Sequence, residues 1–220
     1  MNCGNPSTKA VFSFFKHALV LLLFNACSNV PGREPVANKA DSLSADPVKQ
    51  LQQLETRSAS RQEVPLGTLL GSIEFSVSVK PSAETEETSI PWISLDASPA
   101  ELANLEAAND IVIPYQHIEL IIDYPLSFPA HISLSAEKGF SRLRLFKEIT
   151  AAYNRIYAEE ESSATTKTIP VDKRKTIANR NRTDGRYGIW GHDVSDLVLS
   201  SADVYREAGG KIIVTLVVES

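Results

Sequence analysis

The clearest alternation of apolar and polar positions runs from Ser72 to Lys80. Its odd-numbered positions are Ile, Phe, Val and Val, and all its even-numbered positions are polar. A period of two places one face of a strand in the core and the other in water, as in antiparallel sheets. Similar patterns predict strands over His117–Tyr124 and Ala130–Ala136, with shorter ones over Pro91–Leu95 and Ile111–Ile113.

Two segments carry helix signals. Ser98 followed by proline is typical of an N-cap and predicts a short helix over Pro99–Ala108. A longer helix is predicted over Arg142–Glu161, with Ser141 as its N-cap. Its apolar stripe has a spacing of three or four residues and comprises Leu143, Phe146, Ile149, Tyr153, Ile156 and Tyr157. Glu159–Glu161 are expected at the exposed end of this helix.

The end of the chain predicts a hairpin. Leu197–Arg206 and Lys211–Val218 are rich in aliphatic residues, and the four residues between them suit a turn. The predicted fold is α+β, an antiparallel or mixed β-sheet with one long packed helix and a C-terminal β-hairpin. Residues 65–220 are expected to form this single domain.

The first residues have the parts of a secretory signal. Lys9 and Lys16 supply positive charge, and Ala18–Phe24 is an unbroken apolar stretch. This stretch is well short of the roughly 20 apolar residues that a membrane-spanning helix needs. Residues 1–26 are therefore predicted to be a signal peptide.

The sequence Phe24-Asn25-Ala26-Cys27 resembles the lipobox of bacterial lipoproteins. The resemblance implies that Cys27 is the mature N-terminus and carries acyl chains, palmitate among them, which hold the protein on a membrane. Ser28 rather than Asp follows the cysteine, which favours the outer membrane or cell surface over the inner membrane. Cleavage after Ser28 by an ordinary signal peptidase remains an alternative, since Ala26 would then occupy position −3.

Residues 27–64 are predicted to be the lipidated cysteine and a flexible tether, because they are polar and nearly devoid of aromatic residues. A coil of 37 residues, 28–64, averages about 35 Å between its ends. Within it, Pro47–Arg57 has the pattern of a short polar helix with too few apolar positions to pack firmly.

Cysteine usage and charge exclude several classes of function. The chain has two cysteines, Cys3 in the signal and Cys27, so the mature domain is expected to lack disulfides and thiolate chemistry. Its 22 basic and 27 acidic residues give a formal net charge of −5. Without Lys9 and Lys16 the balance is 20 to 27, or −7, which argues against nucleic acid as a partner.

The connection Thr165–Asp196 is unusually long, and its second half concentrates residues that can carry chemistry. No cofactor is predicted, but nitrogen and carboxylate ligands suit a divalent metal such as zinc, manganese or iron. The candidate ligands are Asp184, His192, Asp193 and Asp196, with His117 or His131 as further ligands if the fold brings them close.

The same segment supports two other hypotheses. The first is catalysis by His192, with Asp193 and Asp196 as candidates, although neighbouring residues on an extended chain point in opposite directions. The second is a binding surface, since aromatic residues and arginine dominate recognition sites. Its candidates are Arg182, Arg186, Tyr187 and Trp190. In a purely structural alternative, Trp190 fills the core and the glycines adopt the backbone angles that the loop requires and that other residues rarely adopt.

The leading hypothesis is a non-enzymatic, lipid-anchored domain of the bacterial cell envelope, with an envelope protein or glycan as its partner. The alternative is a metal- or His-dependent hydrolase that acts on an envelope substrate. No Gly-x-Ser-x-Gly motif supports a serine nucleophile for that alternative.

Overall fold

The computed structural model describes residues 43–62, 66–81, 88–175 and 180–220. They belong to one compact unit that begins at Ser42. The predicted signal peptide and Cys27 lie outside the described residues. Within the described ranges, no helix has both the length and the apolar character required to cross a bilayer.

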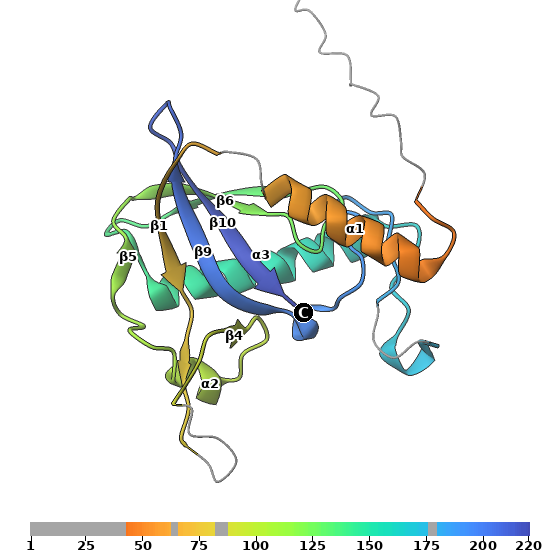
Figure 1. The fold of residues 1–220 in the computed structure, drawn as a ribbon, viewed down its shortest axis with the longest axis horizontal. Helices are drawn as coiled ribbons and strands as arrows, with labels where there is room; N and C mark the ends of the chain where they lie inside the picture. Colours follow the sequence, from red (N-terminus) through yellow and green to blue (C-terminus); the bar gives the residue numbers. More distant parts are fainter. Residues whose placement is uncertain (1–42, 63–65, 82–87, 176–179) are drawn as a thin grey trace, which may run out of the picture. The chain divides into compact units, whose positions relative to one another are not determined.

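A mixed six-stranded sheet forms the centre of this unit (Figure 1). The strands along its main path are, in order, β1 (Thr68–Glu74), β9 (Val198–Arg206), β10 (Ile212–Glu219), β6 (His117–Ile122) and β7 (Ala130–Ser135). The short strand β4 (Ile93–Ser94) also pairs with β9. β10 and β6 are parallel, and the other pairings are antiparallel. The predicted fold class and the C-terminal hairpin, β9–β10, are confirmed.

Smaller elements surround the sheet. They are β2 (Val77–Ser78), β3 (Ser89–Ile90), α2 (Pro99–Ala103), β5 (Ile111–Ile113), β8 (Phe140–Ser141) and the 3-10 turns η1 (Val171–Lys173) and η2 (Val194–Asp196). The predicted strand over residues 72–80 is divided in two, because β1 pairs with β9 whereas β2 turns away to pair with β3. Helix α2 ends early because the N–H of Asn104 turns back to the carbonyl groups of Glu101 and Leu102.

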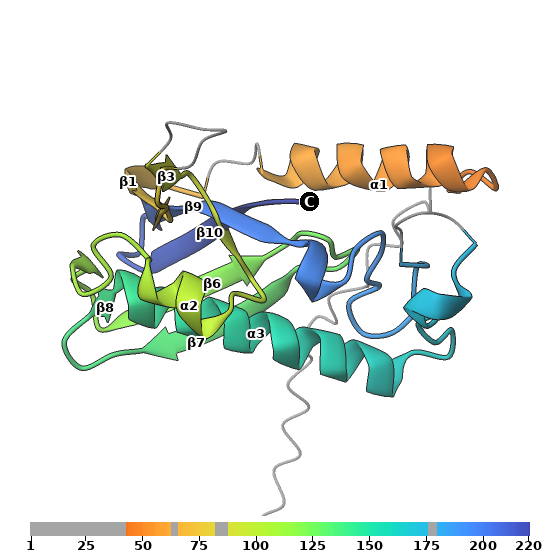
Figure 2. The same cartoon turned by 90° about the horizontal axis from the view of Figure 1, so that it is seen from below.

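Helix α3 (Arg142–Ser163) lies along one face of the sheet (Figure 2). Ser141 caps it as predicted, by accepting a hydrogen bond from the backbone N–H of Arg144. Its buried side chains are Leu145, Phe146, Ile149, Ala152, Tyr153, Ile156 and Glu160. The apolar stripe is therefore largely confirmed, but the expectation that Glu160 is exposed is wrong.

Helix α1 (Pro47–Gln62) packs against the rest of the unit, on the side of the sheet away from α3 (Figure 2). Leu54 is 5% exposed and belongs to the main core. Arg61 donates hydrogen bonds to the carbonyl oxygens of Asp123 (3.1 Å) and Leu126 (2.7 Å). The structure thus differs from the predicted flexible tether at residues 47–62, because one buried leucine and a few polar contacts suffice to dock a mostly polar helix.

We expect Leu54→Ala to lower the free energy of unfolding by about 2 kcal/mol, since it removes a buried side chain and leaves a cavity. Val48 on the same helix is 65% exposed. Its replacement by alanine is the control and should change stability by less than about 0.5 kcal/mol. Urea unfolding measures both. Equal, small effects of the two substitutions would contradict the docking of α1.

Candidate functional site

The carboxylate of Glu160 is the centre around which the chain after α3 is wrapped. Glu160 lies in the last turns of α3 and is 0% exposed. Its oxygens accept hydrogen bonds from the Thr183 hydroxyl (2.5 Å) and from the backbone N–H groups of Gly185 (2.9 Å), Tyr187 (2.7 Å), Gly188 (3.1 Å) and Ile189 (3.4 Å). We call Thr183–Ile189 the Glu160 loop.

These hydrogen bonds keep the buried carboxylate ionised. Burial is the largest single influence on the pKa of Glu160 and raises it. The hydrogen bonds from Thr183 and from the amides of Gly185, Tyr187 and Gly188 act in the opposite direction, and together they leave the pKa below its ordinary value. The ionised form is therefore part of the folded structure.

Glycines allow the loop to approach the carboxylate. A Cβ atom on Gly185 would lie 2.7 Å from the backbone oxygen of Glu160 and 2.8 Å from its carboxylate. Gly188 has a φ of +60°, which side chains other than that of glycine rarely adopt. The closely spaced glycines thus serve a close contact within the protein.

Two side chains of the Glu160 loop, exposed Arg186 and partly buried Tyr187, contact Glu159. The Arg186 side chain is 67% exposed and forms an ion pair with Glu159 at 3.1 Å. The Tyr187 hydroxyl donates to the same carboxylate at 2.6 Å, and the Arg186 guanidinium lies 5.4 Å from the centre of the tyrosine ring. Next to them is Phe128, which is 60% exposed and whose N–H bonds to the Tyr187 carbonyl oxygen at 3.0 Å.

We call Phe128, Arg186 and Tyr187 the aromatic–arginine surface. Among the predicted binding residues, Arg182 is exposed as well. Trp190 is not part of this surface, because it is 1% exposed and packs edge-on against Tyr124 with ring centres 5.3 Å apart. Phe128 was missed, since a single phenylalanine in a proline-rich turn gives no sign of its exposure.

The aspartates proposed as metal ligands make separate contacts. Asp184 accepts a hydrogen bond from the Thr166 N–H (2.7 Å), and Asp196 accepts one from the Asp193 N–H (2.9 Å). The side chain of Asp193 pairs with Arg174 at 2.6 Å. In the part of the chain that the structure describes, no group of three or more His, Cys, Asp or Glu side chains is placed to hold a metal ion.

The two other histidines considered as ligands lie on the sheet. His117 begins β6, and His131 lies on β7. The Nδ1 atom of His131 is 2.7 Å from the carboxylate of Glu119, a residue of β6. Neither histidine is brought to the 179–196 segment in a group of metal ligands.

His192 links the end of the sheet to α1. Its Nε2 atom lies 3.3 Å from the Ser220 hydroxyl and 3.6 Å from the Glu55 carboxylate, and its ring stacks on Tyr124 at 5.7 Å. In a Ser–His–acid triad the hydroxyl and the acid bind opposite ring nitrogens. Here both approach the same nitrogen, so this arrangement is not that of a triad.

Tyr124 completes the contact at His192. Its hydroxyl donates to Glu55 (3.2 Å) and lies 3.0 Å from the Ser220 hydroxyl. Burial, with a smaller influence from Glu55, raises the pKa of Tyr124 to about 12, so the hydroxyl stays protonated and can donate. Sequence reasoning missed Glu55, Tyr124 and Ser220 because they lie far from His192 along the chain.

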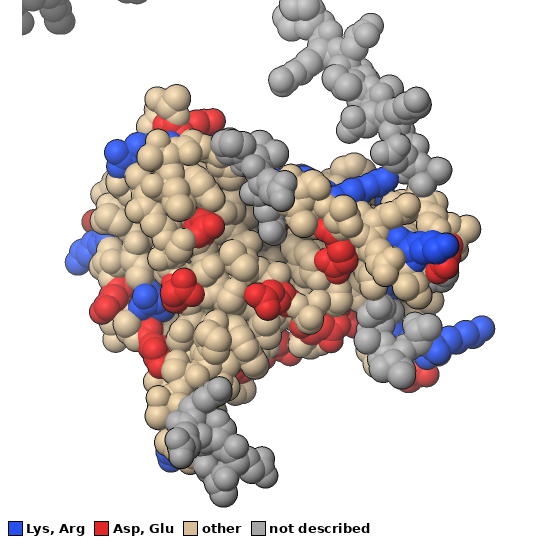
Figure 3. Space-filling view, in the orientation of Figure 1, with Lys and Arg blue, Asp and Glu red and all other residues tan. Residues whose placement is uncertain are grey.

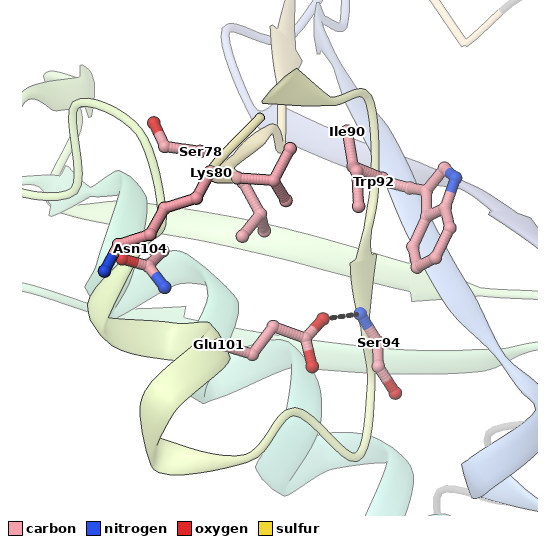
Figure 4. Close-up of a pocket in the computed structure, with 9 residues that line it drawn as sticks. Ser78, Lys80, Ile90, Trp92, Ser94, Glu101 and Asn104 are labelled. Atoms are coloured by element: carbon pink, nitrogen blue, oxygen red, sulfur yellow. Dashed lines mark hydrogen bonds between the residues drawn. The ribbon is translucent and has the colours of Figure 1, made fainter. Parts of the chain in front are cut away.

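A separate groove of about 650 Å³ lies between β2, β3 and α2 (Figure 4). Its walls carry Ile90 and Trp92, the latter 40% exposed, and Glu101 accepts a hydrogen bond from the Ser94 N–H at 2.9 Å. None of the residues singled out in the sequence for chemistry lines it.

Comparison of the chain with models of protein families, with curated proteins and with solved structures finds no match.

We expect Glu160→Gln to lower the free energy of unfolding by about 2–3 kcal/mol at neutral pH. The neutral glutamine side chain cannot accept charge-assisted hydrogen bonds, and its NH2 group would face the N–H donors of the Glu160 loop. The folded-state pKa of Glu160 is depressed. Its contribution to stability is thus full above the unfolded-state value, about 4.3, and is lost as the pH falls through the folded-state pKa.

Urea unfolding between pH 7 and pH 3 measures both effects, and Glu160→Gln should flatten the acid limb of the stability profile. Glu148→Gln on the same helix is the control, since that residue is partly exposed in a surface ion pair with Arg144. A variant as stable as wild type would show that the loop does not depend on the carboxylate.

Proposed function

We propose that the chain is a lipid-anchored, non-enzymatic domain of the bacterial cell envelope that binds a partner through the aromatic–arginine surface. The observation that carries this proposal is the contact of the Arg186 and Tyr187 side chains with the Glu159 carboxylate, next to the buried Glu160. Side chains ordered before binding lose less conformational entropy on association, which strengthens recognition. Phenylalanine, tyrosine and arginine are also enriched in protein interfaces.

The partner we propose is an envelope protein that offers an apolar side chain to Phe128 and a carboxylate to Arg186. The acidic residue Glu159 already occupies one side of the Arg186 guanidinium. The Arg186 side chain is 67% exposed, and its guanidinium has further donors to offer. A glycan that stacks on the aromatic rings is the other outcome to be tested.

Support for a binding rather than a catalytic role comes from the contacts of the polar candidates. Asp193 is engaged with Arg174, Asp184 with Thr166 and Asp196 with the start of η2. His192 joins α1 to the end of the sheet. We take these contacts to stabilise the fold, which supports a binding role.

The anchor rests on the resemblance of residues 24–27 to a lipobox. If Cys27 is acylated, Cys27→Ser should move the protein from the membrane fraction to the soluble fraction, since the acyl chains supply the attachment. Cys3→Ser is the control and should leave fractionation unchanged. Mass spectrometry of the mature N-terminus identifies the modification, and an unmodified Cys27 or unchanged membrane association would rule out the anchor.

The contact surface is tested by a photoreactive phenylalanine analogue in place of Phe128 in the full chain, in the cells that produce it. We expect a discrete protein adduct, and Arg186→Ala should weaken the association by about 2 kcal/mol, the effect of losing an interface hot spot. The same analogue at Val217, which is 37% exposed on β10, is the control and should give no such adduct. An adduct unaffected by Arg186→Ala, or binding to isolated cell-wall glycan alone, would contradict a protein partner.

A further inference from the structure

The segment that follows α3 exposes apolar side chains beside lysines. Val171 is 72% exposed and Ile169 is 42% exposed. Lys173 and Lys175 follow within a few residues and are also exposed, as is Asp172 between Val171 and Lys173. Apolar tips among basic residues are typical of surfaces that lie in the headgroup region of a bilayer, where the apolar groups enter the interface and the lysines meet phosphate.

Polar contacts hold this segment in its exposed position. The Ile169 N–H donates to the Asn181 side chain (2.7 Å), whose amide donates to the Lys167 carbonyl oxygen (3.1 Å). Arg174 donates to the Ile169 carbonyl oxygen (2.9 Å) and pairs with Asp193 (2.6 Å). The outward position of Ile169 is therefore part of the fold.

This segment and the start of α1 lie at the same end of the unit, as both ribbon views show for η1 and the first turn of α1 (Figures 1 and 2). Val48 in that first turn is 65% exposed and is followed by Lys49. The opposite end carries β8, and the 22 residues of α3 separate the two ends by about 33 Å. In Figure 3, basic and acidic side chains both occur towards the η1 end, whereas acidic ones predominate over the middle of the visible face.

The length of chain between Cys27 and Leu43 limits how the unit can stand on a membrane. These positions are 16 residues apart, which spans at most about 55 Å even when fully extended. Because α1 is docked, the connection is less than half as long as the 37 residues first predicted. The end at which the chain enters α1 is the part of the unit nearest to Cys27 along the sequence.

We propose that the membrane-facing end, formed by Ile169, Val171, Lys173, Lys175 and Val48, lies against an anionic lipid bilayer. This proposal rests on the lipid anchor at Cys27. The lysines meet the lipid phosphates, the exposed aliphatic side chains enter the interface, and the aromatic–arginine surface is left to a separate partner.

The test uses the mature, acylated full chain reconstituted in phosphatidylcholine vesicles with or without one third phosphatidylglycerol. Val171→Cys supplies a single free thiol, because Cys27 is blocked by acylation and Cys3 leaves with the signal. An environment-sensitive fluorophore on that thiol should shift to the blue in the anionic vesicles and be quenched by brominated lipid. The same fluorophore at position 217 is the control. Its emission should match that of the label in water, and brominated lipid should not quench it.

Two double variants test whether the contact of position 171 with the bilayer depends on the lysines. Lys173→Glu with Lys175→Glu should reduce the quenching at position 171 at least fivefold. Lys138→Glu with Lys80→Glu makes the same change in net charge on exposed lysines elsewhere and should leave the quenching unchanged.

Two results would overturn the proposal while the anchor stands. One is an acylated, vesicle-bound chain whose label at position 171 reports water in both lipid mixtures. The other is a label shielded only in native membranes, which would indicate a protein contact. Failure of the anchor is separate, because mass spectrometry of the same sample would then find Cys27 without acyl chains.

Discussion

The chain after α3 depends on one buried charge. An ionised carboxylate that leaves water without hydrogen-bond donors destabilises a fold by several kcal/mol. Glu160 therefore has to be surrounded by donors, and the Thr183 hydroxyl with the amides of the Glu160 loop supplies them. This requirement fixes the course of the loop. It leaves Tyr187 partly exposed, whereas Trp190, three residues later, enters the core.

A second dependence joins the N-terminal helix to the end of the sheet. Arg61 satisfies carbonyl groups of the turn after β6, Leu54 enters the core, and Glu55 meets His192 and Tyr124. Each contact is modest, and the polar ones are partly exposed. Together they turn a segment with the composition of a tether into part of the domain, which shortens the connection to Cys27.

The local signals in the sequence predicted most of the fold. Alternation identified β6 and β7, and Ser98 and Ser141 cap their helices as expected, because both features depend on near neighbours. The parallel pairing of β6 with β10 and the burial of Glu160 depend on residues far apart in the chain. Three consecutive glutamates at a helix end look solvated, and their sequence gives no sign of donors that lie 23–29 residues away.

The same dependence on distant residues explains why the sequence of residues 179–196 suggested a catalytic or metal site. Its glycines permit the approach to Glu160, and Asp193 balances the charge of Arg174. Glycine, aspartate and arginine are needed to stabilise buried charges as well as to catalyse reactions. A high content of these residues in one segment therefore does not distinguish a structural role from a catalytic one. Exposure together with a contact that restrains the side chain is the better criterion for a binding residue, since such a side chain loses less conformational entropy on association. Arg186 meets it, whereas Trp190, though the most conspicuous residue of the segment, does not.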